Sequence, residues 1–363
     1  MGDADARVAL VQSAIGQYRT DFVSEVRARL GSRFTVACGD RSFDRYATAL
    51  PAELVDVRLA NRFFLGNRFL YQKGVIRLLR NHDVLVMELN PRVLTVWLAV
   101  LLKRLLGTRV VLWGHYNGRT HGEIRPRLTR RLLASMSDAV VAYTELDVAK
   151  FTSLLPAKPI YLAANATEKR NSIALAAEGP RSNFVYSGRL IPEKNVELLL
   201  FGFQRAVALG PAGSDPELVI VGDGPSRQSL EMLASELGIS HRMQFLGEVF
   251  ESSRLDEIYS RAVAALCGGY VGLNITQALS RGVPFIYRGD ANHSPEISIA
   301  VRGFNSFVSE SADPENFARL MVRASLESAA GLVDYREIQS RTLRTYSVDS
   351  MAEGFIAALG TRD

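Results

Sequence analysis

The sequence contains only two cysteines, Cys38 and Cys267, and they lie far apart in the chain. Two cysteines exclude a disulfide framework, and a zinc site built from cysteine and histidine is unsupported. The opening residues, MGDADARVAL, lack a basic head followed by an apolar run, so no secretory signal is visible and we expect a cytoplasmic protein. The longest apolar run, Leu94–Leu102, falls short of the roughly 20 residues that span a bilayer. An integral membrane protein is therefore not expected.

Charge is divided unevenly along the 363 residues. Residues 1–180 carry 26 basic and 16 acidic side chains, a net charge of +10, whereas the remainder has a net charge of −5. A basic first half would suit an anionic membrane or a phosphorylated substrate. Nucleic acid is not expected as a partner, because the sequence has no helix-turn-helix, zinc-finger or RNP pattern. With 47% hydrophobic and 22% charged residues, the composition is that of an ordinary globular protein.

Short apolar runs alternate with amphipathic stretches in both halves of the chain, which predicts parallel sheets covered by helices on both faces. The first series has expected strands at 8–11, 34–37, 54–57, 84–88, 110–113, 139–143 and 160–162, and helices near 18–30, 70–80, 91–106 and 124–137. The second has expected strands at 184–186, 218–221, 243–246, 262–267 and 284–287, and helices near 194–208, 225–237, 252–261 and 273–281. Further helices are expected from Asp313-Pro314 onward and near 348–360. The polar stretch 165–183 is interpreted as the linker between the two series.

A basic turn, Gly188–Asn195 (GRLIPEKN), follows an expected strand and opens an expected helix. Such a turn directs backbone N–H groups and the positive helix end toward an anion. Arg189 and Lys194 add two full charges, one a planar fork and one a point charge, as a bound diphosphate would require. A solvated turn with ordinary surface charges is the alternative.

Two glycine motifs follow further strands of the second half. Gly222–Pro225 (GDGP) is a tight turn after strand 218–221, and Gly272–Pro284 (GLNITQALSRGVP) follows the strand that ends at Cys267. Glycine lets a backbone approach a ligand closely, and the carboxyl ends of parallel strands are where open sheets bind ligands. Simple strand-to-helix turns would also explain both motifs.

A resemblance to a known family is carried by five motifs in order: VYSGRLIPEKNVELLLFGF, ELVIVGDGPSRQSL, QFLGEV, GLNITQALSRGVPFI and SPEI. Their order and spacing over about 120 residues resemble the donor half of family-4 retaining glycosyltransferases, glycosyl transferases group 1, of the GT-B fold. The resemblance implies an α/β protein with two Rossmann-like domains whose parallel sheets face each other across a cleft. Residues 1–165 would then bind the acceptor, residues 166–345 would bind the nucleotide-sugar donor, and residues 346–363 would form a helix returning toward the first domain.

The resemblance also implies roles for individual residues. Arg189 and Lys194 would hold the donor diphosphate and stabilise the leaving nucleotide, and His115 would lie near the transferred sugar. The other implied donor-binding residues are Gly16, Gly188, Gly222, Asp223, Gly224, Glu248, Val249, Gly272, Leu273, Asn274, Ile275, Thr276 and Gln277. The implied acceptor-binding residues are Tyr18, Arg19, Tyr116, Asn117 and Arg119.

The sequence departs from this family at two positions. The family usually carries two glutamates eight positions apart, and here those positions are Gly269 and Gln277. Either the protein belongs to a variant subgroup with a compensating polar cluster, for which Asn292, His293 and Glu296 are candidates, or it has lost transfer activity. The intact basic pair and glycine turns favour the first interpretation.

Transfer of this kind requires positive groups where the departing diphosphate gains charge. The leaving phosphate itself could deprotonate the acceptor hydroxyl, with His115 orienting the sugar or relaying a proton. No DxD sequence stands near a donor motif, so neither a metal nor another cofactor is expected beyond the nucleotide-sugar substrate.

Two stretches of the first half mix arginine with large apolar residues: Arg62–Tyr71, continued by Lys73, Arg77 and Arg80, and Arg125–Leu133. A basic amphipathic surface would rest on anionic lipid, which predicts a lipid-linked or membrane-proximal acceptor and peripheral contact with the inner face of the cell membrane. Alternatively, the apolar residues form the core and the arginines a solvated face.

Together these observations predict a retaining hexosyltransferase that moves a sugar from a nucleoside-diphosphate sugar to a hydroxyl of a glycan or lipid-linked acceptor. Synthesis of cell-surface polysaccharide, such as lipopolysaccharide, or of a glycoconjugate is the expected context. A non-catalytic nucleotide- or glycan-binding descendant and a sugar-nucleotide epimerase on the same scaffold are the alternatives. An NAD-dependent oxidoreductase is disfavoured, because no GxGxxG follows the first strand.

Overall fold

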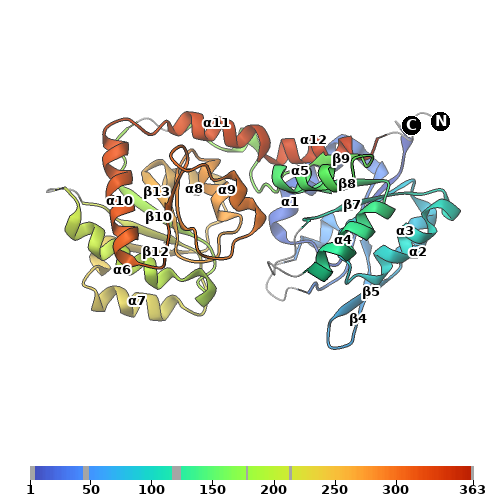
Figure 1. Ribbon diagram of the computed structural model, residues 1–363, viewed down its shortest axis with the longest axis horizontal. Helices are drawn as coiled ribbons and strands as arrows, with labels where there is room; N and C mark the ends of the chain where they lie inside the picture. The colour runs from blue at the N-terminus through green and yellow to red at the C-terminus, as the bar shows by residue number, and fades with distance from the viewer. Residues whose placement is uncertain (1–4, 44–48, 117–123, 177–178, 212–214, 361–363) are drawn as a thin grey trace. The chain divides into compact units, whose positions relative to one another are not determined.

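The chain forms two compact units in the computed structural model, which describes residues 5–43, 49–116, 124–176, 179–211 and 215–360 (Figure 1). The first unit comprises Met1–Thr167 and Val348–Asp363, and the second comprises Glu168–Ser347. The last helix, α12 (Val348–Ala357), therefore belongs to the first unit although it follows the second in sequence. Among the described residues, no helix combines the length and apolarity needed to cross a membrane.

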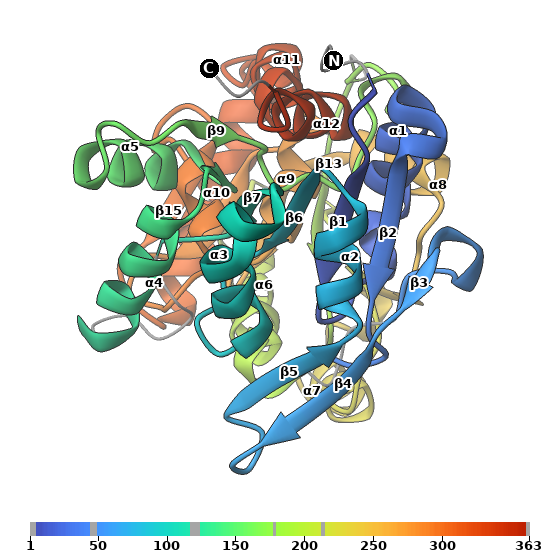
Figure 2. The same ribbon diagram turned by 90° about the vertical axis from the view of Figure 1, so that its right-hand side faces the viewer.

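A parallel seven-stranded sheet forms the centre of the first unit (Figure 2). Its strands lie in the order β3 (Val57–Arg58), β2 (Phe34–Cys38), β1 (Val8–Gln12), β6 (Val84–Glu88), β7 (Arg109–Trp113), β8 (Ala139–Ala142) and β9 (Ile160–Leu162). The central strands are buried on both sides, as their near-continuous apolar sequence predicts.

Alternate residues of the strands face two helical layers. Val8 and Leu10 point to the side covered by α1 (Thr20–Leu30) and α12. Ala9 and Val11 point to the opposite side. That side is covered by α2 (Val75–Asn81), α3 (Leu94–Leu106), α4 (Ile124–Met136) and α5 (Glu145–Leu154). The two-residue period of a strand thus produces two separate cores from one sequence.

A β-hairpin replaces part of what the sequence predicted as helix. β4 (Ala60–Phe64) and β5 (Phe69–Lys73) pair antiparallel, and α2 begins only after Gly74, whose φ is +110°. The expected helix over 70–80 is therefore wrong in its first part, because cross-strand pairing outweighs helical spacing over so short a run. The expected strand at 54–57 is also wrong: Ala52–Leu54 is a 3-10 turn, and β3 contains only Val57–Arg58.

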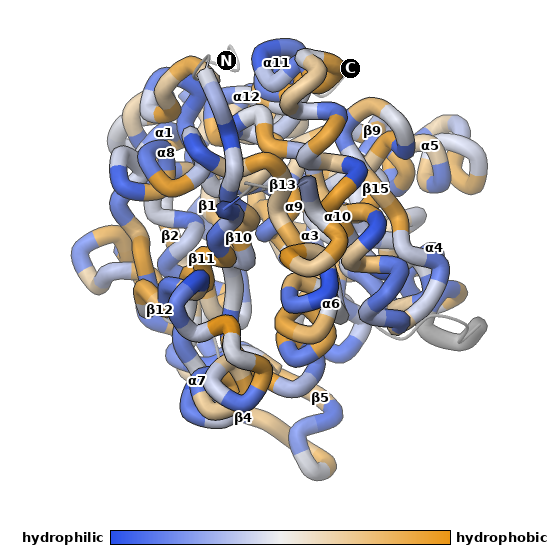
Figure 3. The backbone as a smooth tube through the Cα atoms, turned by 90° about the vertical axis from the view of Figure 1, so that its left-hand side faces the viewer, coloured by the Kyte–Doolittle hydropathy of each residue, from blue (hydrophilic) through white to orange (hydrophobic). Residues whose placement is uncertain are grey.

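The second unit has a parallel six-stranded sheet. Its order is β12 (Met243–Gly247), β11 (Leu218–Val221), β10 (Asn183–Ser187), β13 (Ala262–Cys267), β14 (Phe285–Arg288) and β15 (Ser306–Ser309). One face packs against α6 (Val196–Leu209), α7 (Arg227–Glu236) and α10 (Pro314–Ala329), and the other against α8 (Ser252–Ser260), α9 (Asn274–Leu279) and α11 (Tyr335–Thr345). Figure 3 shows apolar and polar segments alternating along the chain, as helices with one buried face require. Helices α5 and α11 and strands β4 and β15 were not expected from the sequence.

Short 3-10 helices complete the chain at Gln17–Arg19, Gly31–Arg33, Arg170–Ser172, Pro192–Lys194, Ser240–Arg242 and Pro295–Ile299. The polar stretch interpreted as a linker is fixed to the second unit over much of its length. The backbone N–H of Ala174 donates to Asp256 at 2.9 Å, and that of Ala176 donates to Gln339 at 2.8 Å. Only its first residues, up to Thr167, belong to the first unit.

Helix α12 approaches strand β9 at Gly354, where a side chain has no room. A Cβ atom there would lie 1.7 Å from the carbonyl oxygen of Leu162. We expect Gly354→Ala to lower the free energy of unfolding by about 1–3 kcal/mol, because the helix must shift away from the strand. Urea unfolding measures this, and the exposed neighbour Glu353→Ala, expected to change stability by less than about 0.5 kcal/mol, is the control. Equal stability of the two variants would show that this contact is not formed.

Candidate active site

The order of strands along each sheet reverses once, and this point locates the candidate site. In the second unit the reversal lies between the neighbouring strands β10 and β13. Open α/β sheets bind ligands beyond the carboxyl ends of the strands at such a point. There β10 leads into the basic turn 188–195 and β13 leads into the glycine loop 268–273. Two motifs that are 80 residues apart in sequence therefore open from adjacent strands.

Lys194 connects these two loops. Its Nζ donates a hydrogen bond to the carbonyl oxygen of Tyr270 at 2.7 Å and lies 5.3 Å from the centroid of the Tyr270 ring. The same Nζ is 3.8 Å from where a Cβ of Gly272 would stand. Burial is the main reason that the pKa of Lys194 is lowered, and the nearby charge of Arg189 lowers it further. Arg189 itself is exposed in the turn, where its carbonyl oxygen accepts a hydrogen bond from the Tyr186 hydroxyl.

The predicted turn Gly222-Asp223-Gly224 packs against the same basic turn. A Cβ on Gly222 would lie 2.0 Å from the carbonyl oxygen of Gly188, and one on Gly224 would lie 2.4 Å from that of Leu190. Both glycines also have positive φ, +129° and +156°. The Asp223 carboxylate accepts from the Gly224 N–H at 2.7 Å. Glycine at these positions thus allows two backbones to touch at the carboxyl edge of the sheet.

Gly269, at the position where the resemblance predicts the first glutamate, is fixed by the same packing. Its Cβ would lie 2.3 Å from the carbonyl oxygen of Glu193, and a Cβ on Gly268 would lie 2.2 Å from that of Asn195. The N–H of Tyr270 donates to the Glu193 carbonyl at 3.0 Å. A side chain at position 269 is therefore excluded, because the basic turn lies against the space that it would need.

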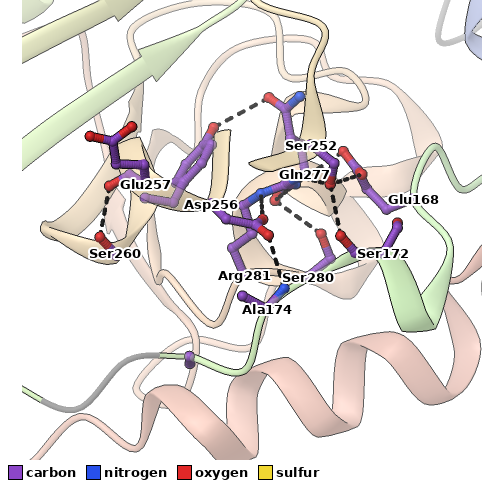
Figure 4. Close-up of polar contacts among 12 residues, drawn as sticks. Glu168, Ser172, Ala174, Ser252, Asp256, Glu257, Ser260, Gln277, Ser280 and Arg281 are labelled. Atoms are coloured by element: carbon purple, nitrogen blue, oxygen red, sulfur yellow. Dashed lines mark hydrogen bonds and ion pairs between the residues drawn. The ribbon is translucent and has the colours of Figure 1, made fainter. Parts of the chain in front are cut away.

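Gln277, at the position where the resemblance predicts the second glutamate, lies in a hydrogen-bonded group of polar side chains (Figure 4). Its Oε1 accepts from the Ser187 hydroxyl at 2.6 Å and from the Tyr259 hydroxyl at 3.3 Å. Burial raises the pKa of Tyr259 to about 12, so the phenol remains a neutral donor. Gln277 thus joins the end of β10 to helices α8 and α9.

Sequence reasoning missed Arg281, one helical turn after Gln277. Its side chain is 2% exposed and forms ion pairs with Glu168 at 3.0 Å and Asp256 at 2.8 Å (Figure 4). It also donates to the Ser252 hydroxyl at 3.1 Å. Its position four residues after Gln277 was the available sequence signal that the two side chains lie close together. Its ion-pair partners, Glu168 and Asp256, could not be predicted because they lie far away in sequence. This group orients the helix that carries Gln277.

The remaining predicted residues of the second unit have varied surroundings. Asn274 Oδ1 accepts from the Gly272 N–H at 2.9 Å, and Thr276 Oγ1 donates to the Leu273 carbonyl at 2.7 Å. Ile275 is fully buried. Glu248 is exposed and Val249 is half-buried, both just beyond the end of β12.

The three residues of the proposed compensating cluster, Asn292, His293 and Glu296, have different surroundings. His293 Nδ1 accepts from the Val271 N–H at 3.2 Å, and its Nε2 lies 2.6 Å from the carbonyl oxygen of Arg288, which fixes Nε2 as the donor. Burial is the main reason that the pKa of His293 is lowered. Glu296 is buried and Asn292 is exposed. His293 therefore supports the glycine loop.

In the first unit, His115 follows strand β7 and is held by a carboxylate. His115 Nδ1 lies 2.8 Å from Asp147 Oδ2, and the Tyr116 N–H donates to Asp147 Oδ1 at 3.0 Å. The Thr144 hydroxyl donates to the same carboxylate at 2.9 Å. Because an ionised carboxylate only accepts, it places the hydrogen of a neutral His115 on Nδ1. Asp147 was not found from the sequence, since it lies on α5, which was not predicted.

The other predicted residues of the first unit differ in exposure. Arg19 is 5% exposed, and its guanidinium lies 5.0 Å from the Trp113 ring centroid and 5.2 Å from that of Tyr143. Tyr116 is 8% exposed and packs edge-on against Phe151. Gly16 is buried beside the end of β1, whereas Tyr18 is 47% exposed. Asn117 and Arg119 lie outside the described residues.

A half-buried carboxyl group lies at the reversal point of the first sheet, between β1 and β6. Glu88 ends strand β6 and accepts from the Ser13 N–H at 2.9 Å and from Asn90 Nδ2 at 3.2 Å. Burial raises the pKa of Glu88. Within the part of the chain that the structure describes, no group of three or more His, Cys, Asp or Glu side chains is arranged to hold a metal ion. Whether the reaction depends on a metal stays a prediction.

Comparison with known proteins agrees with this geometry. Residues 168–335 match the family described as Glycosyl transferases group 1. The matched segment lies within the second unit, and the expected glycosyltransferase is confirmed. No curated protein matches the sequence.

Solved structures resemble the chain over nearly its whole length. One is the lipopolysaccharide outer core galactosyltransferase WaaB in apo form, with 17% identity, a TM-score of 0.67 and coverage of 97% of this chain and 98% of that one. Another is Anabaena Alr3699/HepE in complex with UDP, with 13% identity, a TM-score of 0.69 and coverage of 97% and 99%. A third is sucrose-phosphate synthase (tll1590) from Thermosynechococcus elongatus, with 14% identity, a TM-score of 0.64 and coverage of 97% and 98%. These likenesses confirm the predicted GT-B fold.

The packing at Gly269 makes a prediction about stability. We expect Gly269→Ala to lower the free energy of unfolding by about 1–3 kcal/mol, because the new methyl group meets the backbone of the basic turn. Gly272→Ala is the matched control in the same loop, since its nearest neighbour would be the Lys194 Nζ at an ordinary 3.8 Å. Urea unfolding measures both. A tolerated Gly269→Ala would show that the turn does not occupy this space.

The contacts of His293 make a prediction about pH. Burial holds the pKa of folded His293 below its unfolded value, so the unfolded chain binds a proton that the folded chain excludes. Stability from this group is therefore present above the unfolded pKa of about 6.5 and is lost as pH falls. We expect the free energy of unfolding to decline more steeply between pH 7.5 and pH 5 in the natural protein than in His293→Gln. Parallel profiles would contradict the role of this histidine.

Proposed function

We propose that the protein is a retaining transferase that moves a sugar from a nucleoside-diphosphate sugar to a hydroxyl of a glycan or lipid-linked acceptor. The observation that carries this proposal is the contact of Lys194 with the glycine loop 268–273. Both lie inside the segment that matches the family described as Glycosyl transferases group 1. Synthesis of cell-surface polysaccharide or glycoconjugate is the proposed context, supported by the likeness to a lipopolysaccharide galactosyltransferase.

The charges of the second unit support a diphosphate at this position. The Lys194 ammonium is held by a carbonyl dipole, and within the described residues the groups that shift its pKa include no carboxylate. A bound diphosphate would supply the missing counter-charge and favour the ammonium form. Helix α6 begins directly after the same turn, so its positive end adds to the field. As the sugar departs, Lys194 and Arg189 would stabilise the charge that grows on the leaving phosphate.

Replacement of the two usual glutamates alters how the sugar and ribose would be held. Neutral Gln277 places no negative charge beside the diphosphate, and its amide can donate to and accept from hydroxyl groups. At Gly269 only backbone groups remain. We propose that the donor sugar is held by the backbone of the glycine loop, which His293 contacts at the Val271 N–H and Lys194 contacts at the Tyr270 carbonyl.

The first unit is proposed to bind the acceptor. The carboxyl edge of its sheet carries His115, whose ring Asp147 holds in one tautomer, and a histidine there can orient a sugar hydroxyl or relay a proton. We further propose that the basic first unit contacts the inner face of an anionic membrane and that the reaction requires no metal. The leaving phosphate would take the proton of the acceptor hydroxyl.

Lys194 provides the direct test. We expect Lys194→Met to lower turnover by about 10²–10³-fold, because one preplaced charge at the leaving group is lost. Arg189→Ala should also lower turnover. Arg205→Ala, an exposed cation on α6 of the same unit, should leave turnover unchanged. The assay supplies a panel of nucleotide sugars, chosen first by thermal shift with UDP, GDP, ADP, dTDP and CMP. Full turnover in both Lys194→Met and Arg189→Ala would rule out the diphosphate assignment.

A non-catalytic binding protein is the second candidate, favoured by the absence of a carboxylate at positions 269 and 277. It would bind one of these nucleotides, lose binding in Lys194→Met, and transfer or hydrolyse no donor sugar. The same panel therefore separates the two functions.

A further inference from the structure

The β4–β5 hairpin of the first unit has one face that packs inward and one that does not. In a two-stranded sheet, alternate residues face opposite sides, and directly paired residues share a side. Phe63 pairs with Leu70, and both contact the core beneath α2 and α3. The pairs on the other face are Ala60 with Lys73, Arg62 with Tyr71, and Phe64 with Phe69.

The inner face fastens the hairpin to the rest of the unit. Asn61 Nδ2 donates to the Ser13 carbonyl at 2.7 Å, and Gln72 Nε2 donates to the Gln12 carbonyl at 3.0 Å. Arg92 holds the turn, donating from Nε to the Arg68 carbonyl at 2.9 Å and from Nη2 to the Asn67 carbonyl at 2.7 Å. The hairpin is therefore a fixed projection of the first unit (Figure 2).

The tip presents large apolar side chains to solvent. Leu65 is 75% exposed and Phe64 is 47% exposed. Leu65 also has a φ of +49°, a conformation that bulky residues rarely adopt, and Gly66 and Asn67 follow with +62° and +64°. A polar residue or glycine would suit this turn better in water. The exposed leucine and phenylalanine therefore indicate that the tip meets an apolar phase.

The charged residues around the tip indicate which apolar phase it contacts. Between Val57 and His82 the sequence has six basic residues and no acidic residue. Arg62, Arg68 and Lys73 are exposed on the hairpin, and Arg77 and Arg80 are exposed on the adjoining helix α2. Apolar side chains at the tip, surrounded by cations, complement a bilayer with anionic headgroups. The apolar side chains would enter the boundary of the acyl chains, and the cations would contact lipid phosphates.

We propose that the β4–β5 hairpin docks the protein on an anionic membrane by inserting Phe64 and Leu65 among the headgroups. This inference deepens the membrane contact of the proposed function by naming its surface. A bilayer contact here would bring the acceptor-binding unit to lipid-linked acceptors. It does not require donor binding, since the hairpin lies outside the unit that carries Lys194.

Co-sedimentation with phosphatidylcholine vesicles containing about a quarter phosphatidylglycerol, at low salt and without nucleotide, tests the proposal. We expect Phe64→Ser/Leu65→Ser to lower the partition coefficient at least about tenfold. Leu209→Ser/Leu332→Ser of the second unit, where the leucines are 52% and 74% exposed, is the matched control and should bind as the natural protein does. Arg62→Gln/Arg68→Gln should weaken binding about fivefold per charge, whereas Arg205→Gln should not.

Insertion itself is measured with the Phe64→Trp variant. Its tryptophan fluorescence should shift to shorter wavelength on these vesicles and be quenched by brominated acyl chains. Equal vesicle binding by the natural protein and Phe64→Ser/Leu65→Ser, or no binding by either, would overturn the proposal. The proposal would also be overturned if the natural protein self-associated and Phe64→Ser/Leu65→Ser lost this self-association but still bound vesicles. The tip would then be a contact with a second copy of the chain. Turnover on a soluble acceptor should be unchanged in the double variant, so this result is independent of the Lys194 test.

Discussion

Close packing of backbone on backbone at the carboxyl edge of the second sheet is the constraint on which the candidate site depends. The turn that carries Arg189 and Lys194 is in contact with Gly222 and Gly224 on one side and with Gly268 and Gly269 on the other. Each contact is possible only where a Cβ atom is absent. The glycines thus fix the position of the turn, and the turn fixes the position of the ammonium group.

Two cations of the second unit, buried Arg281 and half-buried Lys194, are balanced in different ways. Arg281 is enclosed by Glu168 and Asp256, which complete its charge and make it a structural group that joins the start of the unit to α8 and α9. Lys194 is held by the carbonyl of Tyr270, a dipole without full charge. A partly desolvated cation that lacks a carboxylate is favoured when an anion binds beside it. This contrast separates a cation that maintains the fold from one suited to a phosphorylated ligand.

The first unit combines a rigid sheet edge with a projecting apolar tip. His115, held by Asp147, lies at the carboxyl end of β7, and the β4–β5 hairpin is anchored to β1 through Asn61 and Gln72. Exposed cations adjoin the apolar tip, whereas the sequence of the second unit carries a net negative charge. The uneven charge of the chain is consistent with two units that meet different molecules.

The sequence by itself determined the fold class, the alternation of strands and helices, and the glycine and basic motifs of the second unit, because these depend on local periodicity and on glycine and charge at fixed spacing. It failed at residues 70–73, which have helical spacing but pair with β4, and it missed α5, so Asp147 remained hidden. Only the tertiary structure decided that Gly269 faces the Glu193 carbonyl, that Arg281 joins Glu168 to Asp256, and that Arg19 is enclosed by aromatic rings. These contacts join residues distant in sequence, and their partners are set by the order of strands in the sheets rather than by any local pattern.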